Sequence, residues 1–179
     1  MQTGKAEFNF IATTYKGLEG ESKAECVGVL RGLGDATPSI WNTGVSGLLI
    51  GRTSLDVFDV VAKLKSMVAE DPWCIRLLLR FIPIEAVTAA KPDAVKEAVS
   101  ERLSRVGKEE SFRVTVEKRH NETPSAQFIE AAASALHQKV DLETPDWVVL
   151  IEVVGEMAGV SLLRPNSIFS YPKAKRGEP

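Results

Sequence analysis

The chain has 179 residues and a formal net charge of −2, from 22 Lys and Arg against 24 Asp and Glu. Its 44% hydrophobic and 26% charged residues are ordinary for a globular protein and exclude a disordered or fibrous chain. The near-neutral charge excludes attraction of a polyanion by the whole molecule, so a nucleic-acid surface must gather its basic residues on one face. This length favours two compact modules of about 80 to 90 residues each.

The first half reads as alternating strands and helices. Aromatic and β-branched residues predict a first strand at residues 8–16. Ser22 and Glu25 have the spacing of a capping box, which predicts the start of the first helix there. Gly34 stands where a left-handed residue would end this helix.

A hairpin, a second helix and a further strand follow. Two β-like runs, residues 39–42 and 45–52, are separated by little more than a turn and predict a hairpin. Ser54 is expected to cap a helix that stops at Asp71. Apolar alternation over residues 75–81 predicts a long strand. The order strand, helix, strand, strand, helix, strand is that of a ferredoxin-like fold with both helices on one sheet face.

The second half has the different order helix, helix, strand, helix, strand, strand. The expected elements are a short helical piece after Glu85, a helix from Pro92 to Val106, a strand at residues 112–117, a helix opened by Thr123 and Pro124, a strand at residues 147–154, and a last strand ending at Arg164. The nearly all-apolar run at 147–154 is typical of a central strand covered on both faces. Residues 171–179 are polar and basic, and we expect a flexible tail. The sequence thus predicts an α+β chain with domains at residues 1–82 and 83–170.

Complete catalytic, metal and membrane motifs are not found in the sequence. Cys26 and Cys74 lie 48 positions apart, without the spacing of a zinc site or a redox pair, and we expect buried free thiols. The only imidazoles are His120 and His137, which leaves little material for a nucleophilic mechanism. No apolar run approaches the roughly 20 residues of a membrane span, and no secretory signal is seen. We therefore expect a soluble cytoplasmic protein without membrane contact, cofactor, metal or catalysis of its own.

A short basic run, residues 118–121, marks the candidate nucleic-acid surface. It lies where a strand meets a helix start, so that its two cations lie beside free helix N–H groups that can bind a phosphate. Arg113 on the same strand, and Arg164 with Asn166 after the last strand, extend this surface if the strands are neighbours. The alternative is an ordinary solvated loop, because short charge runs are common on surfaces.

Residues 81–169 resemble a THUMP domain. Four features carry the resemblance: the Pro83-Ile84-Glu85 opening, the helix from Pro92 to Val106, the strand FRVTVEKRH leading to Thr123-Pro124-Ser125, and the closing strands through residues 147–153. The ferredoxin-like module in front is similar to the domain that precedes THUMP in tRNA-modifying proteins. The resemblance therefore covers nearly the whole chain.

The resemblance implies a non-catalytic adaptor that binds tRNA. This outline is similar to the stand-alone THUMP proteins that assist an RNA cytidine acetyltransferase, which implies binding near the acceptor stem and 3′ end of tRNA. Carried onto this chain, it places the RNA surface at residues 118–125. The expected RNA-binding residues are Arg113, Lys118, Arg119, His120, Asn121, Thr123, Ser125, Arg164 and Asn166. The alternative is a protein-interaction or small-ligand module with no RNA role, which the net negative charge allows.

Overall fold

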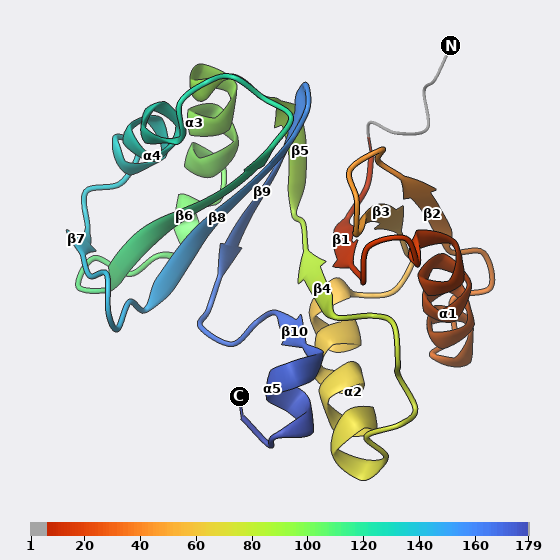
Figure 1. The fold of residues 1–179 in the computed structure, drawn as a ribbon. Coiled ribbons are helices and arrows are strands. Elements are labelled where there is room, and N and C mark those ends of the chain that lie inside the picture. The colour runs from red at the N-terminus through yellow and green to blue at the C-terminus, as the bar shows by residue number, and fades with distance from the viewer. Residues whose placement is uncertain (1–6, 179) are drawn as a thin grey trace. The chain divides into compact units, whose positions relative to one another are not determined.

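The computed structural model describes residues 7–178, which form two compact units (Figure 1). The first, called the N-terminal unit, runs to Ile84 and resumes at Asn166. The second unit runs from Glu85 to Pro165. Among the described residues, no helix is both long enough and apolar enough to cross a membrane.

The N-terminal unit is an antiparallel sheet with its helices on one face. Its strands are β1 (Phe10–Thr13), β2 (Ser39–Asn42), β3 (Leu48–Arg52), β4 (Arg80–Pro83) and β10 (Phe169–Ser170), in the order β10-β4-β1-β3-β2. Its helices are α1 (Glu19–Gly32), α2 (Val57–Glu70) and α5 (Tyr171–Lys175). The predicted ferredoxin-like order and the hairpin of β2 and β3 are confirmed.

The core of this unit is built around stacked aromatic rings. Phe10 and Phe81 lie on neighbouring strands with ring centroids 4.5 Å apart, and both are fully buried. Leu30 of α1 and Leu64 of α2 belong to the same core cluster, which places both helices on one sheet face. Gly51 lies opposite Phe10, and a Cβ there would be only 2.2 Å from the phenyl ring. The sheet therefore needs a glycine where the ring crosses it.

The capping box predicted at the start of α1 is wrong. The helix begins at Glu19, and Ser22 is buried inside it. The Glu25 carboxylate instead accepts backbone N–H groups of residues 76–78, at 2.9, 2.9 and 2.8 Å. Because these N–H groups are held by a side chain, they are not available to a neighbouring strand. The long strand predicted over residues 75–81 is accordingly reduced to the short β4.

The cap of α2 also differs from the prediction. Asp56 accepts from the N–H groups of Phe58 and Asp59, at 2.9 and 3.0 Å. Ser54 lies two residues earlier, and its own N–H donates to the buried Asp35 at 3.0 Å. The helix stops before Asp71, as predicted. Aspartate and serine are both good caps, so the choice between them depends on this tertiary contact.

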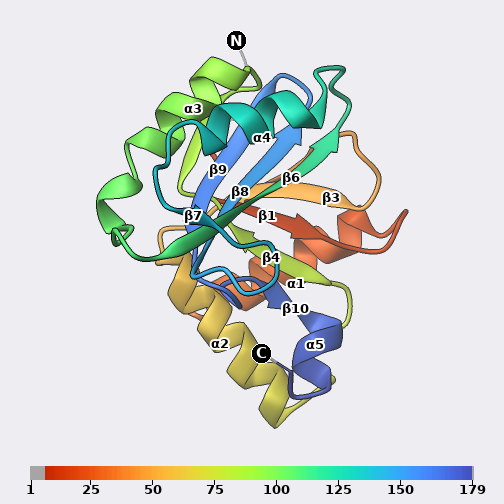
Figure 2. The ribbon, with the colours of Figure 1, turned by 90° about the vertical axis from the view of Figure 1, so that its left-hand side faces the viewer.

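The second unit has a mixed sheet with two helices on one face (Figure 2). Its strands are β5 (Ala86–Ala89), β6 (Ser111–Arg119), β7 (Lys139–Val140), β8 (Trp147–Val154) and β9 (Met157–Leu163), in the order β5-β9-β8-β6-β7. Strand β6 runs parallel to β7 and β8, and the other pairings are antiparallel. The helices are α3 (Pro92–Ser100), the short 3₁₀ helix η1 (Leu103–Arg105) and α4 (Ser125–Ala133). The predicted central position of β8 is confirmed.

One predicted helical segment of this unit is wrong, and a second, correctly started at Pro92, is shorter than predicted. The residues after Glu85 form strand β5, which pairs with β9 with Ala86 opposite Val160. The helix expected to reach Val106 ends at Ser100 and is followed by η1. Arg102 explains the stop, because its guanidinium donates to the carbonyl of Ala98 at 2.6 Å and so caps the end of α3.

The C-terminal residues differ from the expected end of the second domain and flexible tail. Phe169 is fully buried and pairs with Phe81 across β10 and β4. Tyr171–Lys175 form α5. The Tyr171 hydroxyl donates to the Pro72 carbonyl at 2.8 Å. Two aromatic anchors thus return the chain to the N-terminal unit.

Candidate nucleic-acid interface

The predicted junction at residues 118–125 is an ordered turn between β6 and α4. The Lys118 ammonium donates to the Thr123 carbonyl at 2.8 Å. The Asn121 amide donates to the Gly155 carbonyl at 2.8 Å, and its oxygen accepts from the Thr123 N–H at 2.9 Å. Asn121 therefore ties the junction to the turn between β8 and β9.

The start of α4 faces this turn without a side-chain cap. Its N-cap residue is Pro124, and Ser125 is the first helical residue. A helix start leaves backbone N–H groups without intrahelical partners and carries the positive end of the helix dipole. His120, exposed and at a φ of 54°, turns the chain out of β6 just before it. This arrangement can accept an anion such as a phosphate.

Arg119 serves a different role from the one predicted. Its Nη1 lies 2.6 Å from Oε2 of Glu152, which is fully buried, and its Nη2 lies 4.0 Å from Glu117. Glu117 and Glu152 are directly opposite in the parallel pairing of β6 and β8, and Arg119 follows on the same face. The guanidinium neutralises a buried carboxylate, so Arg119 is engaged within the sheet instead of projecting as a free cation.

The nine predicted residues do not form one surface. Arg113 pairs with Val148 at the start of β8, whereas Arg119 pairs with Val154 at its end. Six residues of strand, at about 3.3 Å each, separate the two arginines by about 20 Å. Arg164 follows Leu163, which also pairs with Val148, so it lies at the Arg113 end. The sheet thus divides the predicted surface between two opposite ends.

Asn166 belongs to the N-terminal unit, whereas the other eight predicted residues belong to the second unit. Its carbonyl accepts from the Lys65 ammonium at 2.5 Å. Its φ of 67° lies in the left-handed region, which asparagine tolerates better than most residues. Asn166 therefore bends the chain where it re-enters this unit.

Arg164 lies in a cluster around Trp147. Its guanidinium carbon is 3.8 Å from the ring centroid, and its Nη2 is 2.7 Å from Oε1 of Glu110. The indole N–H donates to the other oxygen of Glu110 at 2.7 Å. Hydrogen bonds from Trp147, from the Gly107 N–H and from Arg164 lower the pKa of Glu110 to about 2. Because Trp147 is only 7% exposed, this cluster fastens the sheet and presents little aromatic surface to a base.

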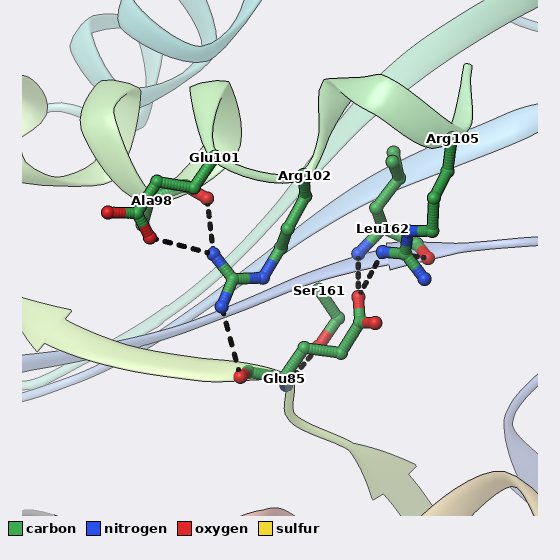
Figure 3. Close-up of polar contacts among 7 residues, drawn as sticks. All are labelled: Glu85, Ala98, Glu101, Arg102, Arg105, Ser161 and Leu162. Carbon is green, nitrogen blue, oxygen red and sulfur yellow. Dashed lines mark hydrogen bonds and ion pairs between the residues drawn. The ribbon is translucent and has the colours of Figure 1, made fainter. Parts of the chain in front are cut away.

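A second arginine network holds β5 to the end of α3 (Figure 3). Oε2 of Glu85 accepts from the Leu162 N–H at 2.7 Å and from Nη2 of Arg105 at 2.8 Å. Arg102 donates to the Glu85 carbonyl at 3.1 Å. Four of the five arginines of the second unit thus pair with carboxylates. They are Arg102, Arg105, Arg119 and Arg164.

The two thiols are free, as predicted, and Cys26 is buried; the predicted burial of Cys74 is wrong, because this side chain is only half-buried. Burial raises the pKa of Cys26 to about 12, and burial also raises the pKa of Cys74. Both are therefore held as neutral thiols, which are poor nucleophiles. Within residues 7–178, no group of three or more His, Cys, Asp or Glu side chains could hold a metal ion.

Comparisons with known proteins agree with this fold. The family model described as THUMP domain matches residues 89–163. The structure is similar to TrmN from Thermus thermophilus, with 18% identity and a TM-score of 0.57 over 89% of this chain and 47% of that chain. It is also similar to PH1313 from Pyrococcus horikoshii Ot3, with 14% identity and a TM-score of 0.58 over 88% of this chain and 55% of that chain.

This chain therefore spans about half the length of these two proteins, and the likeness is one of fold. No curated protein matches the sequence. The family match and the sheet topology together identify the domains: the chain carries a ferredoxin-like domain and, at residues 89–163, a THUMP domain, which is an RNA-binding module of tRNA-modifying enzymes.

Proposed function

We propose that this chain binds tRNA near its acceptor stem and 3′ end and presents it to a separate modifying enzyme, an RNA cytidine acetyltransferase. The observation that carries the proposal is the THUMP domain at residues 89–163. The presence of a ferredoxin-like domain in front supports it, since this is the pairing that the sequence resembles in tRNA-modifying proteins.

In this proposal the junction at residues 118–125 contacts the RNA backbone. The uncapped start of α4 at Ser125 provides backbone N–H groups and a positive dipole end. Beside the start of α4, Lys118 adds an ammonium group and His120 adds an imidazole ring. Asn121 and Thr123 hold the turn in shape through their mutual hydrogen bond. Arg119 acts indirectly, by fixing the end of β6 against Glu152.

Chemistry belongs to the partner enzyme in this proposal. The raised pKa of the Cys26 thiol, caused by burial, keeps the most nucleophilic type of side chain in the chain unreactive. The adaptor would supply no reacting group. It would contribute by binding and orienting the tRNA, which lowers the entropic part of the activation barrier.

The second candidate is a protein-interaction module with no RNA role. It is favoured by the acidic balance of the second unit, which has 10 Lys and Arg against 14 Asp and Glu. Such a unit repels a polyanion over most of its surface. This candidate predicts no retention of tRNA at physiological salt, whereas the first predicts binding that weakens steeply as salt rises.

Binding of RNA by the unmodified chain separates the two candidates, and Ser125→Glu then tests whether the junction at residues 118–125 makes the contact. A carboxylate at the first helical position stabilises the helix by interacting with the positive end of its dipole, but it repels a phosphate that binds at the same place. We expect binding of a labelled acceptor-stem minihelix, measured by fluorescence anisotropy, to weaken on the order of tenfold. The thermal midpoint should stay unchanged or rise.

Gln138→Glu is the matched control, because it adds the same charge to the same unit beside β7, which pairs with the opposite end of β6. The affinity of this variant for the minihelix should equal that of the unmodified chain. Equal loss in both variants, or loss in neither, would remove the junction from the RNA surface. Arg119 is avoided as a test site because its removal would leave Glu152 buried without its guanidinium.

A further inference from the structure

The two units carry different charge. The N-terminal unit has 12 Lys and Arg against 10 Asp and Glu, a net +2, whereas the second unit has 10 against 14, a net −4. The excess of the N-terminal unit comes from residues 166–179, which hold three cations and one acid. A polyanion is therefore attracted to the unit that contains α5, which the family match at residues 89–163 does not include.

The cations of α5 gather with a lysine of α2. The two helices pack side by side (Figure 1), which brings Lys173 near Lys65. Partial burial and the charge of Lys173 both lower the pKa of Lys65. In the part of the chain that the structure describes, neither ammonium forms an ion pair, and the partner of Lys65 is the Asn166 carbonyl. Two neighbouring ammonium groups that form no ion pair favour the binding of an anion between them.

Trp73 lies at the edge of the same cluster and is 67% exposed. The Lys175 ammonium is 4.4 Å from the centroid of its ring. A large aromatic side chain is seldom left this exposed, since burial of its surface is strongly favourable. An exposed ring beside lysines has the composition of surfaces that bind single-stranded nucleic acid, where bases stack on the ring and ammonium groups bind the backbone.

The cluster is held in a defined geometry. The backbone N–H of Trp73 donates to the Asp71 carboxylate at 2.9 Å, and the Tyr171 hydroxyl donates to the neighbouring Pro72 carbonyl at 2.8 Å. The acid that follows α5, Glu178, forms two contacts with Arg176, at 2.5 and 3.0 Å. Glu178 also lies within electrostatic reach of Lys173, but its ion pair is with Arg176, and Lys65, Lys173 and Lys175 form no ion pair within residues 7–178.

We propose that Lys65, Trp73, Lys173 and Lys175, called the α2–α5 face, form a second RNA contact, in which the lysines bind backbone phosphates and the indole stacks on an unpaired base. The inference rests on the proposed function, because it requires that the chain binds RNA. It adds a site on the N-terminal unit and a preference for single-stranded RNA.

The test uses the full chain and two labelled minihelices that differ only at the 3′ end. One carries a single-stranded 3′ tail, and in the other the tail is base-paired. Trp73→Ala should weaken binding of the tailed probe about tenfold and that of the paired probe by less than about twofold, because stacking needs an unpaired base. The double variant Lys173→Gln with Lys175→Gln should weaken binding of both probes. It should also reduce the slope of log K, the association constant, against log salt concentration by about 1.5.

Lys16→Gln with Lys23→Gln is the matched control, since both lysines are exposed in the same unit and outside the α2–α5 face. This control should change the affinity for the tailed probe and for the paired probe by no more than about twofold. If the chain binds RNA but the Trp73 and lysine variants behave like this control, the α2–α5 face is excluded while the proposed function stands.

Three further outcomes separate the two proposals. If the Trp73 and lysine variants lose affinity and Ser125→Glu does not, the α2–α5 face is supported and the α4 junction is removed. If the unmodified chain binds neither probe, both proposals fall. If Trp73→Ala abolishes capture of a protein partner and leaves RNA affinity unchanged, the face is a protein-docking surface and the RNA assignment is overturned.

Discussion

The two units of this protein use their carboxylates in different ways. In the N-terminal unit, Glu25, Asp35 and Asp56 accept hydrogen bonds from backbone N–H groups of loops and a helix start. In the second unit, Glu85, Glu110 and Glu152 pair with arginine guanidinium groups. Carboxylates bonded to the backbone leave cations free, whereas those bonded to guanidinium groups remove cations from the surface. Arg52 and Arg176 of the N-terminal unit do pair with Glu7 and Glu178, but both pairs are exposed.

This difference changes where a polyanion can bind. The run at residues 118–121 lies in the unit where four of the five arginines are already paired with carboxylates. The unpaired lysines that have an exposed aromatic neighbour lie instead on the α2–α5 face. Local density of basic residues in a sequence is therefore a poor guide to free positive charge when buried carboxylates are close in space.

The largest expected effect is on the stability of the second unit. Arg119→Ala leaves the carboxylate of Glu152 buried without its guanidinium, and we expect a loss of about 3 kcal/mol in the free energy of unfolding. Lys118→Ala, next to it on the strand, removes one hydrogen bond to a carbonyl and should cost about 1 kcal/mol. Urea denaturation of both variants measures the difference. Equal losses would mean that the Arg119–Glu152 pair does not hold the strands.

A smaller loss is expected in the N-terminal unit. Glu25→Ala removes a charged acceptor from three backbone N–H groups of residues 76–78, which should cost about 2 kcal/mol. Glu21, an exposed residue in the first turn of the same helix, provides the control, and its replacement by Ala should lower the urea midpoint only slightly, because it removes just a favourable interaction with the helix dipole. If the two variants unfold at the same urea concentration, the carboxylate contributes nothing to the loop.

The smallest effect is a pH dependence of the cluster around Trp147. The pKa of Glu110 is lowered in the folded state, so its contribution to stability is fully present above its unfolded pKa of about 4.3. It is lost as the pH falls towards the folded value of about 2. Glu110→Gln should therefore melt at a lower temperature than the unmodified chain at pH 6, and the gap should close as the pH approaches 2. A gap independent of pH would show that the charge of Glu110 is not involved.

Local patterns in the sequence were enough to predict the elements that depend on near neighbours. The hairpin at residues 39–52, the end of α2 before Asp71 and the strand-to-helix junction at Ser125 follow from turn residues, a helix stop and alternation. The ferredoxin-like order was predictable for the same reason. A THUMP domain was recognisable from the order of its elements, which no single motif specifies.

Contacts between distant residues could not be predicted. Glu25 and its three N–H partners lie more than 50 positions apart in the sequence. The capping-box prediction failed because a Ser and a Glu three residues apart have the same spacing inside a helix as at its start. The pairing of Arg119 with Glu152 depends on the register of two parallel strands, which carries no local signal.

One missed feature did leave a signal in the sequence. Phe169 and Tyr171, two aromatic residues directly before the basic C-terminal residues, indicate anchoring, and Trp73 stands directly after the helix stop where polar turn residues are usual. Read together, these residues would have suggested that the basic segment is docked and lies near an aromatic side chain.

The central claim is that RNA contacts both the α4 junction and the α2–α5 face. Ultraviolet cross-linking of the full chain to the tailed minihelix, followed by mass spectrometry of the peptides, tests it most directly. The account predicts cross-links in peptides that contain Trp73 or residues 171–175 and in the peptide that contains residues 120–125. Cross-links confined to α3 and to the Arg164 end of the sheet would contradict it.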